Sequence, residues 1–243
     1  MEKIKVYTYH GFGDQCICYG ILKEFAKRYN EVKVYSDVMN KNTFNSITRL
    51  YSSLKNVELI DEVYKEEIHA ADHKIAHTKY WFDKVLPWYQ DPSLPPPEWF
   101  KDDWWFDRQW YLNASLPFNL KWDNFYFERD LNKEKEVFYD ILGLKDNQEF
   151  LFFHEDPVRN YNINKKHLNA NIKWIDFFNY QDISILDILY TIEHAKEVHT
   201  FNTSTLTFID LMNIQHPALY YHMYVRPSIF DSINLRLPWN LIT

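Results

Sequence analysis

The chain has 243 residues, of which 46% are hydrophobic and 25% are charged, and this composition excludes a largely disordered protein. Its 34 acidic and 27 basic residues give a net charge of −7, so the electropositive surface that non-specific nucleic-acid binding requires is not expected. No apolar stretch approaches the roughly 20 residues of a membrane span, and the first residues read as a strand rather than as a signal segment. We therefore expect a soluble, cytoplasmic protein that has no transmembrane segment and does not bind nucleic acid.

Strand and helix patterns alternate along the first part of the chain. Alternating or short apolar runs predict strands at 3–9, 32–36, 57–60 and 74–78, and apolar residues at helical spacing predict helices at 14–29 and 41–54. Such alternation requires crossover connections and predicts a parallel sheet. Cys16 and Cys18 fall in the first helix on different faces, so we expect two free thiols.

An aromatic segment at 80–111 interrupts the alternation. Six of the nine tryptophans lie between Trp81 and Trp110. Clustered aromatics are usually core, but sugar rings also stack on indoles, so the segment could instead form an acceptor platform. In that interpretation, the acceptor-binding residues are Trp104, Trp105, Asp103 and Asp107.

The alternation resumes after the aromatic segment. We expect strands at 125–127, 149–154, 171–177, 197–201 and 218–224, and helices at 132–142, 185–195 and 205–212. Gly143 should end the first of these helices, and Ser184 should cap the second. The chain is thus predicted to be an α/β protein with two α/β halves.

Three of the four glycines, Gly11, Gly13 and Gly20, surround the first strand-to-helix junction. Glycine allows a tight turn there and lets backbone amides approach a ligand at the helix N-terminus. Cys16 stands where the dinucleotide fingerprint has its third glycine, so an NAD site is disfavoured. The glycines could also serve turn geometry alone.

Two loops in the second half carry groups suited to phosphate. His154 and Arg159 follow one predicted strand, with Lys165 or Lys166 a few residues later, and a guanidinium can grip phosphate oxygens with two nitrogens. The alternative is a surface arginine paired with Glu155 or Asp156. Asn202, Thr203, Ser204 and Thr205 follow another strand and offer hydroxyls and amides at a helix start, although Thr203 or Ser204 could be a simple helix cap.

The run Gly11-Phe12-Gly13-Asp14, followed by an apolar helix, resembles the N-terminus of GT-B glycosyltransferases, especially the heptosyltransferase family. The resemblance implies two Rossmann-like domains with a cleft between them: an acceptor domain at 1–116, a donor domain at 117–224, and a segment at 225–243 that packs back on the first domain. It also implies that Asp14 is the catalytic base, although a carboxylate at a helix start could be only a cap.

The same resemblance implies a donor site that includes Gly11, Gly13, His154, Arg159, Asn202, Thr203, Ser204 and Thr205, with His222 and Arg226 of the tail facing the cleft. The sequence departs from the heptosyltransferase pattern in the 202–205 turn. Asn202 and Ser204 stand where that family has an acidic residue and a glycine. This departure leaves the donor sugar unassigned.

The predicted function is transfer of a sugar from a nucleoside diphosphate sugar to a glycan acceptor, with inversion implied by the resemblance. No Asp-x-Asp triplet occurs, so we expect a metal-independent reaction without a cofactor. His69, His73 and His77 have helical spacing, but a packed or solvated role is favoured over metal binding. A sugar-nucleotide 2-epimerase and a non-catalytic carbohydrate-binding protein remain alternatives.

Overall fold

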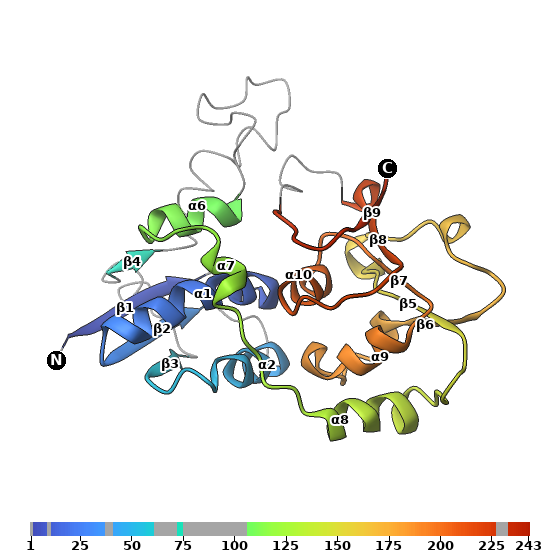
Figure 1. Ribbon diagram of the computed structural model, residues 1–243, viewed down its shortest axis with the longest axis horizontal. Coiled ribbons are helices and arrows are strands. Elements are labelled where there is room, and N and C mark those ends of the chain that lie inside the picture. The colour runs from blue at the N-terminus through green and yellow to red at the C-terminus, as the bar shows by residue number, and fades with distance from the viewer. Residues whose placement is uncertain (1, 9–10, 37–40, 61–71, 75–105, 227–232) are drawn as a thin grey trace. The chain divides into compact units, whose positions relative to one another are not determined.

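The computed structural model describes residues 2–8, 11–36, 41–60, 72–74, 106–226 and 233–243 (Figure 1). The chain divides into two compact units, each with its own parallel sheet. Unit 1 is Met1–Phe125 with Ser232–Asn234, and unit 2 is Tyr126–Asp231 with Leu235–Thr243. The expected α/β class with parallel sheets is confirmed. The two-domain GT-B arrangement with its cleft stays a prediction.

The sheet of unit 1 has the strand order β3-β2-β1-β4, and every neighbouring pair is parallel. The strands are β1 (Lys3–Thr8), β2 (Glu31–Ser36), β3 (Val57–Ile60) and β4 (His73–Lys74). The first three match the sequence prediction, because their apolar alternation is clear. Of the fourth predicted strand, 75–78 lie outside the described residues.

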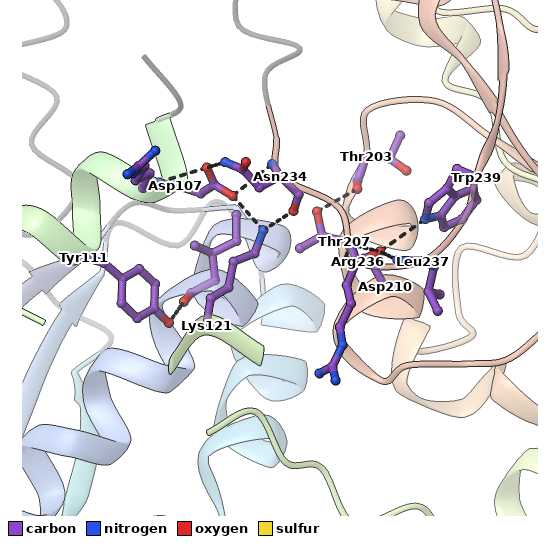
Figure 2. Close-up of polar contacts among 12 residues, drawn as sticks. Asp107, Tyr111, Lys121, Thr203, Thr207, Asp210, Asn234, Arg236, Leu237 and Trp239 are labelled. Atoms are coloured by element: carbon purple, nitrogen blue, oxygen red, sulfur yellow. Dashed lines mark hydrogen bonds and ion pairs between the residues drawn. The ribbon is translucent and has the colours of Figure 1, made fainter. Parts of the chain in front are cut away.

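The helices of unit 1 are α1 (Phe12–Arg28), α2 (Lys41–Tyr51), α6 (Phe106–Asn113) and α7 (Leu120–Asp123). Close packing of α1 explains one of its glycines. A Cβ atom on Gly20 would lie 2.3 Å from the carbonyl oxygen of Leu120 and 2.4 Å from the hydroxyl of Tyr111. The Tyr111 hydroxyl also donates to the carbonyl of Ile17 at 2.9 Å, as Figure 2 shows. Gly20 therefore lets α7 and the Tyr111 ring approach the α1 backbone.

The sheet of unit 2 has the order β6-β5-β7-β8-β9, again with only parallel pairs. Its strands are β5 (Phe150–Phe153), β6 (Lys173–Asp176), β7 (Glu197–Thr200), β8 (Leu219–His222) and β9 (Asn240–Ile242). Side chains alternate between the two faces of each strand. Leu151 and Phe153 join a buried cluster with Phe201, whereas Phe150 on the opposite face packs its ring against Phe138.

The helices of unit 2 are α8 (Leu131–Glu136), which continues as a π-helical turn at Val137–Ile141, then α9 (Leu189–His194) and α10 (Ser204–Leu211). Gly143 adopts a φ of +59° just after the π-helical turn, as expected of a residue that ends a helix. Ser184 accepts from the amide of Leu186, but it caps a short 3-10 turn rather than α9. No strand forms at 125–127, so that prediction was wrong.

The C-terminal segment is divided between the units. The sequence interpretation placed 225–243 on the N-terminal domain, but Leu235–Thr243 belong to unit 2 and β9 pairs with β8. The buried carboxylate of Asp210 in α10 accepts from the amides of Arg236 and Leu237, each at 2.9 Å, and from the indole of Trp239 at 3.3 Å (Figure 2). These contacts bind the segment to α10. Among the described helices, none combines the length and apolar character that crossing a membrane requires.

Candidate functional site

The strand order of unit 2 reverses between β5 and β7. The chain passes from β5 to β6 on one side and then places β7 on the other side of β5. Because all strands are parallel, their carboxyl ends meet at one edge of the sheet. Open parallel sheets bind ligands at that edge, at the point where the strand order reverses. The predicted donor-binding residues of the second half lie in the segments that follow β5 and β7, up to the first turn of α10.

A hydrogen bond joins the two loops at this point. Nδ1 of His154, which follows β5, lies 2.7 Å from Oγ1 of Thr205 in the first turn of α10. Burial lowers the pKa of His154 to about 4, so its imidazole is neutral near pH 7. The ring thus contributes a neutral hydrogen-bonding edge and not a positive charge. The structure brings these two predicted residues into contact, and their role toward a donor stays a prediction.

The N-terminus of α10 is formed by the predicted turn at 202–205. Thr203 is the N-cap, and its hydroxyl accepts from the amide of Leu206 at 3.4 Å, as the helix-cap alternative required. Helix geometry leaves the amides of Ser204 and Thr205 without partners inside the helix. The first turn contains no acidic residue, so no side-chain carboxylate in it offsets the positive end of the helix dipole. This end of α10 is suited to an anion.

Two arginines gather beside one aromatic ring near this helix end. The guanidinium carbons of Arg159 and Arg226 lie 5.5 and 5.6 Å from the ring centroid of Tyr161. Arg226 also donates from Nη1 to the carbonyl of Asn202 at 3.3 Å, which holds its charge at the turn that opens α10. The sequence analysis did not identify Tyr161 as a site residue. Its position two residues after Arg159, in a loop suited to phosphate, could have indicated it.

Arg159 also forms the ion pair that the surface alternative anticipated. Its Nε lies 2.6 Å from the carboxylate of Asp156, and its side chain is 63% exposed. Lys165 is paired too, because its Nζ lies 2.5 Å from the buried carboxylate of Glu155. Lys166 is exposed in the 3-10 turn at Lys165–His167. Arg226 is therefore the better placed of the two arginines, since it donates to a backbone carbonyl and not to an acid.

The predicted catalytic residue lies at the start of α1 in unit 1. The strand order there also reverses, because β2 and β4 lie on opposite sides of β1. Gly11 is the N-cap, and a Cβ at this position would lie 2.5 Å from Oδ2 of Asp14. Gly11 thus makes room for the Asp14 carboxylate, which lies within the first helical turn together with Gly13. The helix dipole stabilises a negative charge at this position.

Asp107, a predicted acceptor-binding residue, is fully buried in unit 1. Its carboxylate accepts from Nζ of Lys121 at 2.6 Å, from the amide of Asn234 at 3.2 Å and from the Asn234 side chain at 3.1 Å (Figure 2). Both carboxylate oxygens therefore hold the fold together. Trp104, Trp105 and Asp103 lie outside the described residues, so their acceptor role stays a prediction.

In the part of the chain that the structure describes, no three His, Cys, Asp or Glu side chains converge in a way that could hold a metal ion. His69 and His77 lie outside that part. The metal-independent reaction therefore stays a prediction. Cys16 and Cys18 are free and buried, and burial raises the pKa of both thiols well above its usual range.

Comparisons with known proteins give one distant likeness. No family model matches the chain, and no curated protein matches it. Among solved structures, the chain is similar to a glycosyl transferase family 9 protein from Veillonella parvula DSM 2008, with 8% sequence identity and a TM-score of 0.48. The match covers 91% of this chain and 79% of that chain. The fold class and the candidate site rest instead on the strand order and contacts described above.

Proposed function

We propose that the protein is a glycosyltransferase of GT-B architecture that uses a nucleoside diphosphate sugar as donor and a glycan as acceptor. The observation that supports it best is the His154–Thr205 hydrogen bond, which joins the loops after β5 and β7 where the strand order reverses. A phosphorylated ligand is the class of molecule that such a helix N-terminus binds.

The proposed diphosphate site consists of the first turn of α10 and Arg226. The amides of Ser204 and Thr205 donate to phosphate oxygens, and the Arg226 guanidinium, held by the Asn202 carbonyl, adds a charge-assisted contact. Arg159 contributes a second positive charge across the Tyr161 ring, weakened by its ion pair with Asp156. Neutral His154 orients Thr205 and adds no charge.

The proposed reaction needs a base and a stabilised leaving group. Asp14 accepts the proton of the acceptor hydroxyl while the hydroxyl oxygen attacks the anomeric carbon. The bond from that carbon to the diphosphate oxygen breaks, and its electron pair leaves with the diphosphate. Arg226 and the positive end of α10 stabilise this charge without a metal ion. Direct displacement by one nucleophile inverts the anomeric configuration.

Calorimetric titration with UDP, GDP, ADP and CDP tests the donor site. At least one nucleoside diphosphate should bind, and Arg226→Ala should weaken that binding roughly ten- to a hundredfold, as expected for loss of a charge-assisted hydrogen bond. Arg159→Ala should have a smaller effect, because Asp156 already pairs with it. Arg236→Ala is the matched control, since that exposed residue contacts Asp210 only through its backbone amide.

Three outcomes separate this proposal from its alternatives. Slow hydrolysis of one nucleotide sugar without acceptor identifies the donor and supports the transferase. Conversion of a nucleotide sugar to an isomer without acceptor supports a 2-epimerase. Tight glycan binding with no affinity for any of the four nucleoside diphosphates would leave a non-catalytic carbohydrate-binding protein.

A further inference from the structure

A chain of hydrogen bonds crosses one face of the second sheet. The carboxylate of Glu197 lies 3.1 Å from Nε2 of His199, and Nδ1 of His199 lies 3.0 Å from Nε2 of His222. Nδ1 of His222 lies 3.1 Å from the hydroxyl of Tyr224, which accepts from the backbone amide of Asn164 at 2.8 Å. We call these five residues the relay.

The relay is shielded from solvent at its centre. His199 is 1% exposed and His222 is 0% exposed. Tyr220 stacks on the His199 ring with centroids 4.5 Å apart. The other titratable groups that face the two imidazoles are exposed His167, whose ring centroid lies 5.8 Å from that of His222, and Lys165. Burial lowers the pKa of both relay histidines, to about 3 for His222, so both are neutral near pH 7.

Neutral rings fix the direction of every hydrogen bond in the relay. The Glu197 carboxylate only accepts, so Nε2 of His199 donates to it and Nδ1 of His199 must accept. Nε2 of His222 then donates to His199, which leaves Nδ1 of His222 as an acceptor for the Tyr224 hydroxyl. The Asn164 amide completes the chain because it can only donate. Each buried donor therefore meets an acceptor, and both histidines carry their proton on Nε2.

The outer end of the relay links two loops of the proposed diphosphate site. Tyr224 lies two residues before Arg226, and Asn164 follows Tyr161, whose ring lies beneath the guanidiniums of Arg226 and Arg159. We propose that the relay is a positioning network: through the hydrogen bond from the Asn164 amide to the Tyr224 hydroxyl, it holds Arg226 and Tyr161 in register for an anionic ligand. The positioning role rests on the proposed function, whereas the proton arrangement does not.

Nitrogen-15 NMR of the histidine rings tests the proton arrangement directly. Both relay histidines should show a protonated Nε2 and an unprotonated Nδ1 at neutral pH. A proton on Nδ1 of His222 would overturn the proposed polarity, because a neutral His222 in that form would accept at Nε2 from His199, which could then keep its hydrogen bond to Glu197 only as a cation. This measurement needs no ligand, so its outcome is independent of the glycosyltransferase proposal.

Tyr224→Phe tests the positioning role, because it removes one hydroxyl and keeps the ring. Tyr220→Phe is the matched control, since it removes the same hydroxyl from a tyrosine of β8, four positions before Tyr224, that lies outside the relay. In Tyr224→Phe, the Asn164 amide proton should exchange with solvent faster than in wild type, and the NMR signal of the Arg226 Nε–H should shift. This variant should also bind inorganic pyrophosphate about fivefold more weakly. The control should leave all three unchanged.

The outcomes distinguish the two proposals. If wild type binds pyrophosphate and both Tyr variants bind it as tightly as wild type does, the positioning role is wrong while the proposed function stands. If wild type binds neither pyrophosphate nor any nucleoside diphosphate, the proposed function fails, and the Asn164 exchange and Arg226 signal still decide whether the relay holds the two loops. An unchanged exchange rate and an unchanged Arg226 signal in Tyr224→Phe would overturn the positioning network.

Discussion

Nδ1 of His154 and Oγ1 of Thr205 lie 2.7 Å apart although 51 positions separate them in the chain. The bond joins the residue that follows β5 to the first turn of α10. Thr205 is fully buried and the His154 ring is largely buried, so little water can reach either polar atom. Each atom therefore relies on the other as its hydrogen-bond partner. Their contact therefore determines how the loop after β5 meets the helix end.

The charge state of His154 gives the first prediction. Its proton signals should not titrate between pH 8 and pH 5, because burial lowers the pKa of this ring to about 4. The unfolded chain binds the proton near pH 6.5. The His154 ring alone should therefore cost the folded state about 1.4 kcal/mol of stability for each unit as the pH falls from about 6.5 to about 4, and should add no such dependence above 6.5.

Denaturant unfolding across this pH range checks the effect. His154→Gln should have a shallower dependence on pH than wild type, because glutamine does not titrate. A midpoint near 6.5 for the His154 signals in the folded protein would show that the ring is accessible to solvent and would contradict the prediction.

The hydroxyl of Thr205 gives the second prediction. Thr205→Val keeps the shape of the side chain but leaves Nδ1 of His154 without its partner, which should cost about 1–3 kcal/mol of unfolding free energy. Thr205→Ser keeps the hydroxyl and should retain most of the stability and the nucleotide affinity. Equal stability of the valine and serine variants would show that the bond contributes nothing.

The sequence predicted elements whose periodicity is local and missed features set by distant contacts. The strand at 57–60 was predicted with its correct ends, and α1 was predicted within two residues at its start. The aromatic run at 125–127 favoured a strand by propensity. Tertiary packing overrides that preference, because Phe125 lies edge-on against Tyr19 of α1 and Phe127 packs against Phe208 of α10.

In the candidate site too, the sequence predicted the features that depend on neighbouring residues and missed those that depend on distant contacts. The types of residue at 202–205 predicted a helix start suited to phosphate, since hydroxyls at that position are a local signal. The approach of Arg226 to Asn202 and Tyr161 depends on the strand order, and the sequence gives no direct measure of strand order. The burial of Asp107 likewise depends on Lys121 and Asn234, which come from other segments.

The Asp107–Lys121 pair gives the third prediction. Asp107→Asn leaves the ammonium of Lys121 buried without its carboxylate, which should cost about 3–5 kcal/mol of stability. The double variant Asp107→Asn with Lys121→Met should recover part of this loss, because no buried charge remains. Asp123→Asn, an exposed acid in the same unit, should change stability by less than about 0.5 kcal/mol.

Thermal melts of the four proteins measure these differences. A stable Asp107→Asn variant with a raised KM for acceptor would instead support the acceptor-binding role that the sequence suggested for Asp107.

The packing of Gly20 gives the fourth prediction. Alanine is favoured over glycine by about 1 kcal/mol within a helix, but a Cβ here would lie 2.3 Å from a backbone oxygen of α7. Because the backbone cannot yield as a flexible side chain would, Gly20→Ala should be destabilising overall, by about 1–3 kcal/mol. Ala26→Gly in the same helix, at a half-buried position, gives an approximate measure of the propensity difference. A Gly20→Ala variant more stable than wild type would show that α7 moves freely away from α1.

The role of Asp14 gives the fifth prediction, tested with Asp14→Asn. Asparagine has nearly the same shape, so it should occupy the space above Gly11, and the lost charge at the helix end should cost only about 0.3–1 kcal/mol. It cannot accept the acceptor proton, so the transfer rate should fall about 10²–10⁴-fold while nucleoside diphosphate affinity stays the same. The rate is measured with the donor that the hydrolysis screen identifies, and the affinity by calorimetry. A folded Asp14→Asn variant that binds donor normally and transfers sugar at the wild-type rate would show that Asp14 only stabilises the start of α1. The base would then be sought at Asp102, Asp103 and the His154–Asp156 loop.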